Sequence, residues 1–387
     1  MNRDSLNKID IGLFFIVFAL ACISCVALYY APVDTGGGGI KSVKLQIMWY
    51  IISSIALVLI MAFGYDRLKR MHWILYGIGL FMLFGLVLAK HGIPVPLAEQ
   101  LNGAWSWYKL PGIGNLQPSE FMKLFLIISL ATTIDKHNEL YPIRGAHEDL
   151  LLLGKIFLVS VPPFLLINMQ PDLGSALVVF SIILATILVS GVSWKYIAGL
   201  MALIVSALTF LTVSWFKFPA IINLVLQAHQ KERFIAWTSP YQYQNQEGYQ
   251  LVQSLNSIGS GQFFNHSFNS SISLPEAYAD FIFSVIGGTF GFVGSVTVIV
   301  LFFVMIQRII RTAVSTHDPF GTYICAGVVG MIMFQVFENI GMTIQVMPIT
   351  GITLPFLSYG GSSLLSSMLC IGLIQSIRMQ SQSLMFS

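Results

Sequence analysis

The sequence predicts an all-α, polytopic membrane protein with about ten transmembrane helices, both termini in the cytoplasm, and a large extracytoplasmic loop between helices 7 and 8. Of its 387 residues, 56% are hydrophobic and only 10% are charged, whereas a soluble domain carries about 25% charged residues. The mean hydropathy is +0.77. A soluble fold of this length needs far more charge to cover its surface. This composition therefore excludes a soluble cytosolic enzyme, a disordered protein and a disulfide scaffold.

The apolar stretches set the number of predicted helices. A hydrocarbon core about 30 Å thick requires about 20 apolar residues in helical conformation. The fourth stretch looks short, because Glu120 and Lys123 stand at its start, and it extends through Thr133 if the helix is tilted. The stretches account for the chain, so we treat residues 1–387 as one transmembrane domain. They lie near 11–30, 45–65, 73–90, 121–134, 150–169, 175–194, 196–216, 280–306, 323–344 and 355–377.

The distribution of basic residues predicts the orientation, because cytoplasmic loops of membrane proteins are enriched in Lys and Arg. With a cytoplasmic N-terminus, the inner segments hold Arg3, Lys8, Arg67, Lys69, Arg70, Lys136, Arg144, Lys195, Arg308, Arg311 and Arg378. The short outer loops hold only Lys41, Lys44, Lys90 and Lys109. The two longest connections, 91–120 and 217–279, then face outward, and long loops of this kind tend to carry function.

The segment 273–283 contains the most distinctive pair of acids. Ser273 and Glu276 form a capping-box pattern, which predicts that a helix begins at Ser273. On such a helix Glu276 and Asp280 share a face, because they are four residues apart. A carboxyl group at the outer membrane boundary, beside a second acid, is expected to have a raised pKa and to suit a general base. The alternative is that Asp280 pairs with a cation of a neighbouring helix.

A second polar segment runs from Asn102 to Lys123. Glu120 and Lys123 are three residues apart at a helix start, so their side chains can form an ion pair. Ion pairs at membrane depth are costly and reflect either function or helix docking, and both interpretations stay open here. Trp105 and Trp107 are either interfacial anchors, their usual role, or part of a site.

Two further segments are rich in Pro and Gly. In Gln170-Pro171-Asp172-Leu173-Gly174, Asp172 is placed to cap the sixth helix. Segment 348–363 predicts a broken helix or re-entrant turn, which membranes tolerate only where the backbone is buried in protein or lines a cavity. Lys155 and Glu338 are isolated charges in the fifth and ninth spans, and they either line a polar interior or contact each other.

Together these segments resemble the SEDS family (shape, elongation, division and sporulation), the RodA/FtsW-type peptidoglycan polymerases, over essentially the whole chain. The matching motifs are Asn102-Gly103-Ala104 with Trp107, Gln117-Pro118-Ser119-Glu120 with Lys123, Gln170 to Gly174, Gly248-Tyr249-Gln250, Ile258 to Gly261, Leu274 to Glu276, Asp280 to Phe283, Asn339 to Met342, and Pro348 to Ser363. The chain departs from the family pattern at Tyr278-Ala279, where His-Thr is usual, and at Gly288-Thr289, where Glu-Glu is common.

The resemblance implies a glycosyltransferase that polymerises lipid II at the outer face of the bacterial cytoplasmic membrane, in support of cell shape, division or sporulation. Asp280 falls on the family's essential acidic position and is the expected catalytic residue. Arg233 is the best candidate for the diphosphate of the substrate, because a guanidinium matches phosphate oxygens. The other expected substrate-binding residues are Lys231, Glu276, Trp107 and Ser358, and those expected to shape the cavity are Glu120, Lys123, Asp172 and Gln170.

The resemblance also implies the partners: lipid II, membrane lipids and a class B penicillin-binding protein with transpeptidase activity. The net charge of +3 gives no indication of nucleic-acid binding. No metal-ligand spacing is visible, so a divalent cation, Mg²⁺ or Mn²⁺, is expected only as an aid at the diphosphate. Two alternative functions remain: a lipid II flippase or other transporter, and a non-catalytic scaffold for a cell-wall synthase.

Overall fold

A computed structural model describes residues 9–32, 38–101, 103–112, 114–217, 228–246, 248–264 and 274–384. Each predicted apolar stretch lies wholly or mostly on one helix. These helices are α2 (Ile11–Tyr30), α3 (Gly39–Phe63), α4 (Tyr65–Lys90), α5 (Pro118–Leu140), α6 (Ala146–Met169), α7 (Leu173–Val189), α8 (Trp194–Lys217), α12 (Ile282–Ser315), α13 (Pro319–Thr343) and α14 (Gly361–Leu384). Eight of them are long and apolar enough to cross a membrane, and α7 is a shorter apolar helix. The remaining one, α5, carries charged side chains near both ends.

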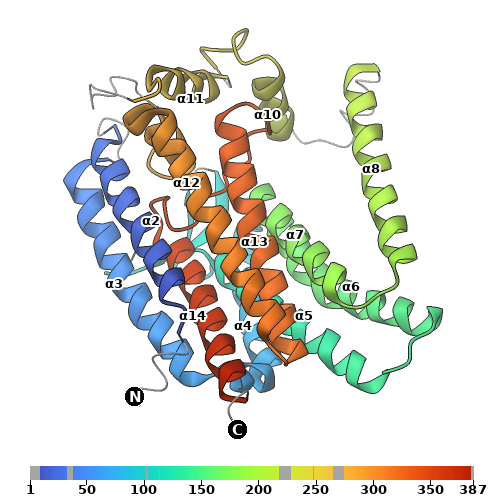
Figure 1. Cartoon of the computed structure of the whole chain (residues 1–387). Helices are drawn as coiled ribbons and strands as arrows, with labels where there is room; N and C mark the ends of the chain where they lie inside the picture. The colour runs from blue at the N-terminus through green and yellow to red at the C-terminus, as the bar shows by residue number, and fades with distance from the viewer. Residues whose placement is uncertain are drawn as a thin grey trace.

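The helices differ greatly in how much of their surface other helices cover. In the most apolar part of each, 78% of α14 and 67% of α13 is buried, against 12% of α8. Figure 1 shows α13 and α14 inside the bundle and α8 standing apart at its edge. Helices α13 and α14 therefore form the core that positions the loop between them, while α8 presents apolar side chains all round, as a lipid-facing helix does.

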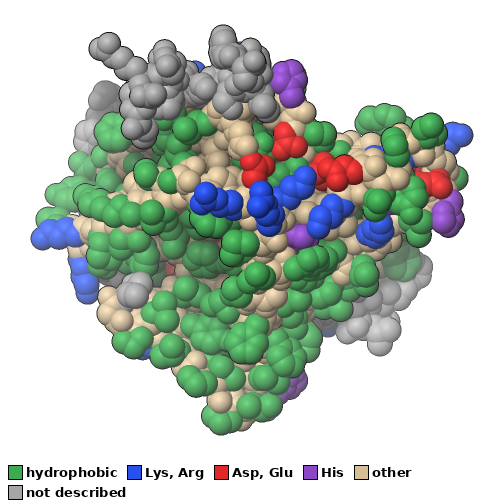
Figure 2. All heavy atoms as spheres, turned by 90° about the horizontal axis from the view of Figure 1, so that it is seen from below, with side chains coloured by type: hydrophobic (Ala, Val, Ile, Leu, Met, Phe, Trp, Pro, Cys, Tyr) green, Lys and Arg blue, Asp and Glu red, His purple; other side chains and the backbone are tan. Residues whose placement is uncertain are grey.

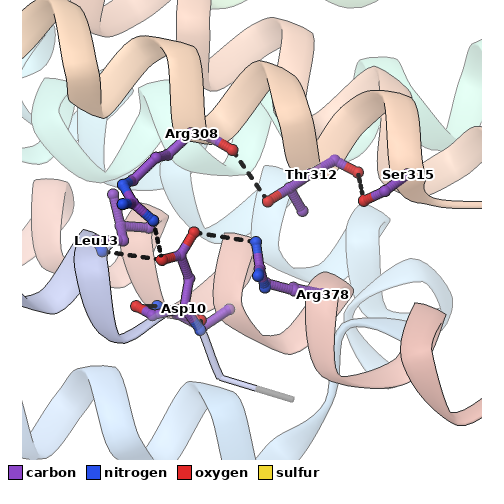
Figure 3. A network of polar contacts seen from close by, with 7 residues as sticks. Asp10, Leu13, Arg308, Thr312, Ser315 and Arg378 are labelled. Atoms are coloured by element: carbon purple, nitrogen blue, oxygen red, sulfur yellow. Dashed lines mark hydrogen bonds and ion pairs between the residues drawn. The ribbon is translucent and has the colours of Figure 1, made fainter. Parts of the chain in front are cut away.

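Both ends of the chain lie at the same side of the bundle. Asp10 accepts hydrogen bonds from Arg308 of α12 (Oδ1, 2.6 Å) and Arg378 of α14 (Oδ2, 3.0 Å), so the start of α2 is tied to the last helix (Figure 3). At the same end, Lys69 pairs with Asp135. Figure 2 shows Lys and Arg side chains forming a band across this face, with Asp and Glu beside them. This arrangement agrees with the predicted cytoplasmic location of both termini.

The opposite, outer end carries α10 (Ala228–Thr238) and α11 (Tyr249–Ser260), the two helices described within the long loop 217–279 (Figure 1). It also carries a small antiparallel sheet in the outer connection 91–120, between α4 and α5, which the all-α prediction did not include. Its strands are β1 (Ala98–Leu101), β2 (Ala104–Leu110) and β3 (Gly114–Leu116), in the order β1-β2-β3. Trp107 of β2 lies opposite Glu99 of β1. Asn102 lies outside the described residues.

The predicted helix start at Ser273 is wrong. Ser273 itself lies outside the described residues, but residues 275–281 form turns and α12 begins only at Ile282. Glu276 has a φ of 55°, a left-handed conformation that a regular α-helix does not accommodate. The backbone of this segment bonds to a distant loop instead: Tyr278 accepts from the main-chain N–H of Tyr359 at 2.9 Å. Glu276 and Asp280 therefore do not share a helix face.

The predicted break in segment 348–363 is confirmed. Helix α13 ends at Thr343 and α14 begins at Gly361, later than the predicted 355, and the residues between them are non-helical. Phe356 has a φ of 64°, which stops a helix from starting earlier. Leu354, Phe356, Leu357 and Ser358 are buried. The stretch 354–358 of this connection, which we call the 344–360 loop, is thus covered by protein, whereas Ile344, Val346 and Gly351 are exposed.

Candidate active site

Asp280 lies in the turns that precede α12, outside that helix, and it meets the 344–360 loop. A Cβ atom added to Gly351 would lie 3.2 Å from Asp280 Oδ2. Gly351 also has a φ of 76°, which favours glycine. The loop approaches the Asp280 carboxylate this closely because residue 351 has no side chain. Asp280 as a whole residue is partly buried.

Two side chains, Asn339 and Ser358, hold the main chain around Asp280 by hydrogen bonds and connect it to the 344–360 loop. Asn339 Nδ2, on α13, donates to the main-chain oxygen of Asp280 and to that of Ile352, both at 2.7 Å. Ser358 Oγ donates to the Ala279 oxygen at 2.7 Å. The same hydroxyl accepts from the Leu354 N–H at 2.8 Å. The protein thus already uses the Ser358 hydroxyl to hold the segment that carries Asp280.

Arg233 reaches the same loop from α10. Its Nη1 atom donates to the Thr350 oxygen at 3.0 Å and to the Ile349 oxygen at 3.4 Å. One turn later, Trp237 Nε1 donates to the Gln345 oxygen at 3.1 Å, and Gln345 Nε2 donates back to the Trp237 oxygen at 3.0 Å. Helix α10 is therefore docked on the 344–360 loop with its guanidinium close enough to influence Asp280.

The electrostatic environment of Asp280 suits proton uptake. Desolvation raises the pKa of Asp280 from 3.8 to about 7, and the Glu276 carboxylate acts in the same direction. The Arg233 guanidinium opposes this rise, while Asp172 adds a small further rise. The expectation of a raised pKa beside a second acid is therefore confirmed, although turns rather than a shared helix face bring Glu276 near.

Asp172 connects the Asp280 region with two other motifs. It caps α7 as predicted, since its Oδ1 atom accepts from the Ser175 N–H at 2.9 Å. Its Oδ2 atom accepts from Gln117 Nε2 at 3.1 Å. A Cβ atom on Gly174 would lie 3.2 Å from the Thr350 oxygen, so the start of α7 packs directly against the 344–360 loop.

The predicted ion pair of Glu120 and Lys123 is present. Lys123 Nζ lies 2.8 Å from Glu120 Oε2, and the side chains are 1% and 8% exposed. Ser366 Oγ of α14 donates to the Glu120 main-chain oxygen at 2.7 Å, which joins the two helices at this depth. The pair lies at the start of α5, close in sequence to Gln117, whose side chain donates to Asp172.

The remaining predicted residues occupy separate positions. Gln170 is buried, donates to the Leu83 oxygen at 3.0 Å and accepts from Ser106 at 3.3 Å, which fits a structural role. Lys231 lies on α10, two residues before Arg233 and partly buried. Lys155 contacts His137 Nδ1 at 3.1 Å, whereas Glu338 contacts Thr350, so the two isolated charges have different partners.

Sequence reasoning did not assign roles to Asn339, Thr350 or Gly351, although all three stand in the quoted motifs. A buried Asn next to a Pro/Gly-rich loop is the signal for such a role, because buried amides are usually hydrogen-bonded to backbone.

Gly288, at one departure from the family pattern, packs against α11: a Cβ atom there would lie 2.6 Å from Ser257 Oγ. A glutamate at that position would displace α11.

The Asp280 carboxylate, whose pKa is raised to about 7, and the Arg233 guanidinium lie in the same region at the outer end of the bundle. Such a pair can take a proton from a hydroxyl group while neutralising an anion beside it. Within the described ranges, no three His, Cys, Asp or Glu side chains are grouped so as to hold a metal ion.

Comparisons with known proteins agree with one another. Residues 9–383 match the family model of a cell cycle protein whose name joins FtsW, RodA and SpoVE. The chain is 30% identical over 381 residues to the probable peptidoglycan glycosyltransferase FtsW of Trichlorobacter lovleyi, covering 96% of this chain and 93% of that protein. It is 32% identical over 359 residues to the peptidoglycan glycosyltransferase RodA of Mycobacterium leprae, covering 89% and 71%. A solved structure, described as showing "structural coordination of polymerization and crosslinking by a peptidoglycan synthase complex", matches with a TM-score of 0.78 and 27% identity, covering 96% of this chain and 98% of that one.

Proposed function

The chain belongs to the FtsW/RodA/SpoVE family of cell cycle proteins, and on that premise we propose that it is a peptidoglycan glycosyltransferase that polymerises lipid II. The reaction takes place at the outer face of the bacterial cytoplasmic membrane. The observation that carries this proposal is the Asp280 carboxyl group, with a pKa raised to about 7 and a position fixed by Asn339 and Gly351, close to the Arg233 guanidinium.

In the proposed reaction, Asp280 takes the proton from the 4-hydroxyl group of the acceptor sugar. The hydroxyl oxygen forms a bond to the anomeric carbon of the donor sugar, and the bond from that carbon to the lipid diphosphate breaks. The diphosphate leaves with the bonding electrons, and Arg233 and Lys231 stabilise its charge. Within the described part of the chain, the hydrogen bonds of Arg233 to the loop carbonyls use only Nη1, so its other N–H groups can bind the diphosphate.

The other predicted residues support this site. Glu276 adjusts the basicity of Asp280, and Trp107 on the outer sheet offers an aromatic face to sugar or lipid. Ser358 and Asp172 hold the segments that frame the carboxylate. Among the described residues, no group of His, Cys, Asp or Glu side chains is arranged to hold a metal ion, and we propose a divalent cation only as a companion of the diphosphate. The protein partner is a class B penicillin-binding protein, supported by the similarity to a member of a peptidoglycan synthase complex.

Polymerisation of labelled lipid II by the purified full-length chain, alone and with candidate transpeptidases, tests the proposal. We expect glycan chains from the wild type and at least a 100-fold loss with Asp280→Asn, which cannot accept the proton. Glu276→Gln, the matched loss of a neighbouring carboxylate, is expected to remain active. Equal yields from the wild type and Asp280→Asn would remove Asp280 from the mechanism. Reconstituted vesicles that translocate lipid II without forming polymer would favour a flippase.

A further inference from the structure

Two adjacent residues at the outer end of α13 contact the two segments that carry the site: the turn with Asp280 and the part of the 344–360 loop that Arg233 contacts. Asn339 holds the main chain at Asp280. Glu338, one residue earlier, holds the stretch of loop on which Arg233 rests. Its Oε1 atom accepts a hydrogen bond from Thr350 Oγ1 at 2.9 Å. The same helix end thus contacts the segment of the base and the segment under the guanidinium.

Burial of the Glu338 carboxyl group is energetically unfavourable. Glu338 is 0% exposed, and its second carboxyl oxygen, Oε2, has no hydrogen-bond partner among the residues that the structure describes. Within those residues it forms no ion pair either. A buried carboxyl group with one oxygen that accepts no hydrogen bond is destabilising, and a leucine would fill the space without that penalty. Its presence calls for a role beyond packing.

Thr350 transmits the contact in two directions. Its side chain donates to Glu338, while its main-chain oxygen accepts from Arg233 Nη1 at 3.0 Å. The next residue is Gly351, whose backbone lies against the Asp280 carboxylate. A shift of the Thr350 main chain therefore moves both the carbonyl group that supports Arg233 and the backbone that lies against the Asp280 carboxylate.

We propose that Glu338 is a positioning residue that acts through Thr350: it fixes the main chain at 349–352, and with it the location of the Arg233 guanidinium relative to Asp280. The consequence for catalysis rests on the proposed function, because it takes Arg233 as the diphosphate-binding group. The structural part of the inference, that the Glu338–Thr350 hydrogen bond orders the loop, stands apart from any activity.

Four variants separate this role from general destabilisation. Glu338→Leu and Thr350→Val remove the hydrogen bond, whereas Glu338→Gln keeps an acceptor oxygen at the same place. Gln335→Leu is the matched control. Gln335 lies one turn earlier on α13, is equally buried and also has an oxygen without a hydrogen-bond partner within the described part of the chain.

The first measurement is hydrogen–deuterium exchange of the detergent-solubilised full chain without substrate. The informative amides are those of Leu354 and Tyr359, which donate to Ser358 and Tyr278. We expect at least tenfold faster exchange there in Glu338→Leu and Thr350→Val, no further increase in the double variant, and wild-type exchange in Glu338→Gln and Gln335→Leu. Unchanged exchange in Glu338→Leu, or equally fast exchange in Gln335→Leu, would overturn the inference.

The second measurement is steady-state polymerisation of lipid II. We expect Glu338→Leu and Thr350→Val to raise KM at least fivefold with a smaller effect on kcat, because the guanidinium is misplaced while the base remains. Glu338→Gln is expected to restore the wild-type KM. Additive KM effects in the double variant would overturn transmission through Thr350. A wild type that makes no polymer would instead refute the proposed function, while the exchange experiment still decides whether Glu338 orders the loop.

Discussion

The amide of Asn339 donates a 2.7 Å hydrogen bond to the main-chain oxygen of Asp280, across 59 residues of sequence. The same amide holds the oxygen of Ile352 at 2.7 Å. One side chain of α13 thus joins the turn that carries the proposed base to the loop that faces it. This link fixes the geometry of the site, because the turn at 275–281 has no helix of its own to hold it.

Replacing Asn339 by leucine should therefore impair both folding and catalysis. We expect a stability loss of about 2 kcal/mol, since one buried and one partly buried carbonyl group lose this donor, and about a tenfold lower kcat. The matched control is Asn138→Leu, which removes hydrogen bonds to Ser190 (3.1 Å) and Tyr323 (2.7 Å) at the other end of the bundle. Asn138→Leu should lower the melting temperature by a similar amount but retain the wild-type kcat. Thermal unfolding in detergent and lipid II turnover measure both, and equal kcat values for the two variants would contradict the assignment.

The rate should depend on pH through Asp280. Because its pKa is raised to about 7 and the base must be ionised, kcat/KM should fall about tenfold per pH unit below that value. Glu276→Gln removes a carboxylate that raises this pKa, so its profile should move to lower pH. Arg233→Gln removes the cation that lowers the pKa, so its profile should move to higher pH. Profiles that shift in the same direction would refute this electrostatic account.

The raised pKa of Asp280 also predicts how the stability of the folded protein depends on pH. A carboxyl group whose pKa is raised on folding costs stability as the pH rises through the interval between its ordinary and its raised value. At pH 8 the wild type contains an ionised, desolvated Asp280, and Asp280→Asn should melt at a higher temperature. At pH 5 the wild-type group is protonated and the difference should shrink. A constant difference between the two pH values would argue against a raised pKa.

The buried pair of Glu120 and Lys123 should be sensitive to the loss of one partner. Lys123→Met leaves a buried carboxylate without its counter-charge and is expected to cost about 3 kcal/mol. The double variant Glu120→Gln/Lys123→Met should recover part of that loss. Lys109→Met, at the exposed pair with Glu99, is the control and should change stability by less than about 1 kcal/mol. Unfolding curves in detergent measure these stability changes, and equal losses of stability for Lys123→Met and Lys109→Met would contradict the prediction.

Asp10 should matter for stability alone. Asp10→Asn removes ion pairs to Arg308 and Arg378 at the end of the bundle opposite α10 and α11, and we expect a loss of about 2 kcal/mol because the two guanidinium groups then lack a buried counter-charge. The kcat of the folded protein should equal that of the wild type. A lower kcat with unchanged thermal unfolding would show that this network communicates with the outer site.

The sequence alone determined the class of protein, the position of the helices and most of the candidate residues. Hydropathy predicts spans because each apolar stretch faces the same requirement, a hydrocarbon core of fixed thickness. Two short-range patterns were also confirmed: the i, i+3 spacing of Glu120 and Lys123 predicted their ion pair, and the position of Asp172 before an apolar run predicted the cap of α7.

Only the tertiary structure decided how the outer site is assembled. The local pattern from Ser273 to Asp280 favours a helix, but Tyr278, Ala279 and Asp280 give their carbonyl oxygens to Tyr359, Ser358 and Asn339. Those partners lie about sixty or more residues away, and no local pattern encodes them. Hydropathy reports how a segment meets the bilayer, whereas the conformation of a polar loop depends on which distant donors satisfy its backbone. For that reason the sequence identified Asp280, and only the fold showed what holds it in place.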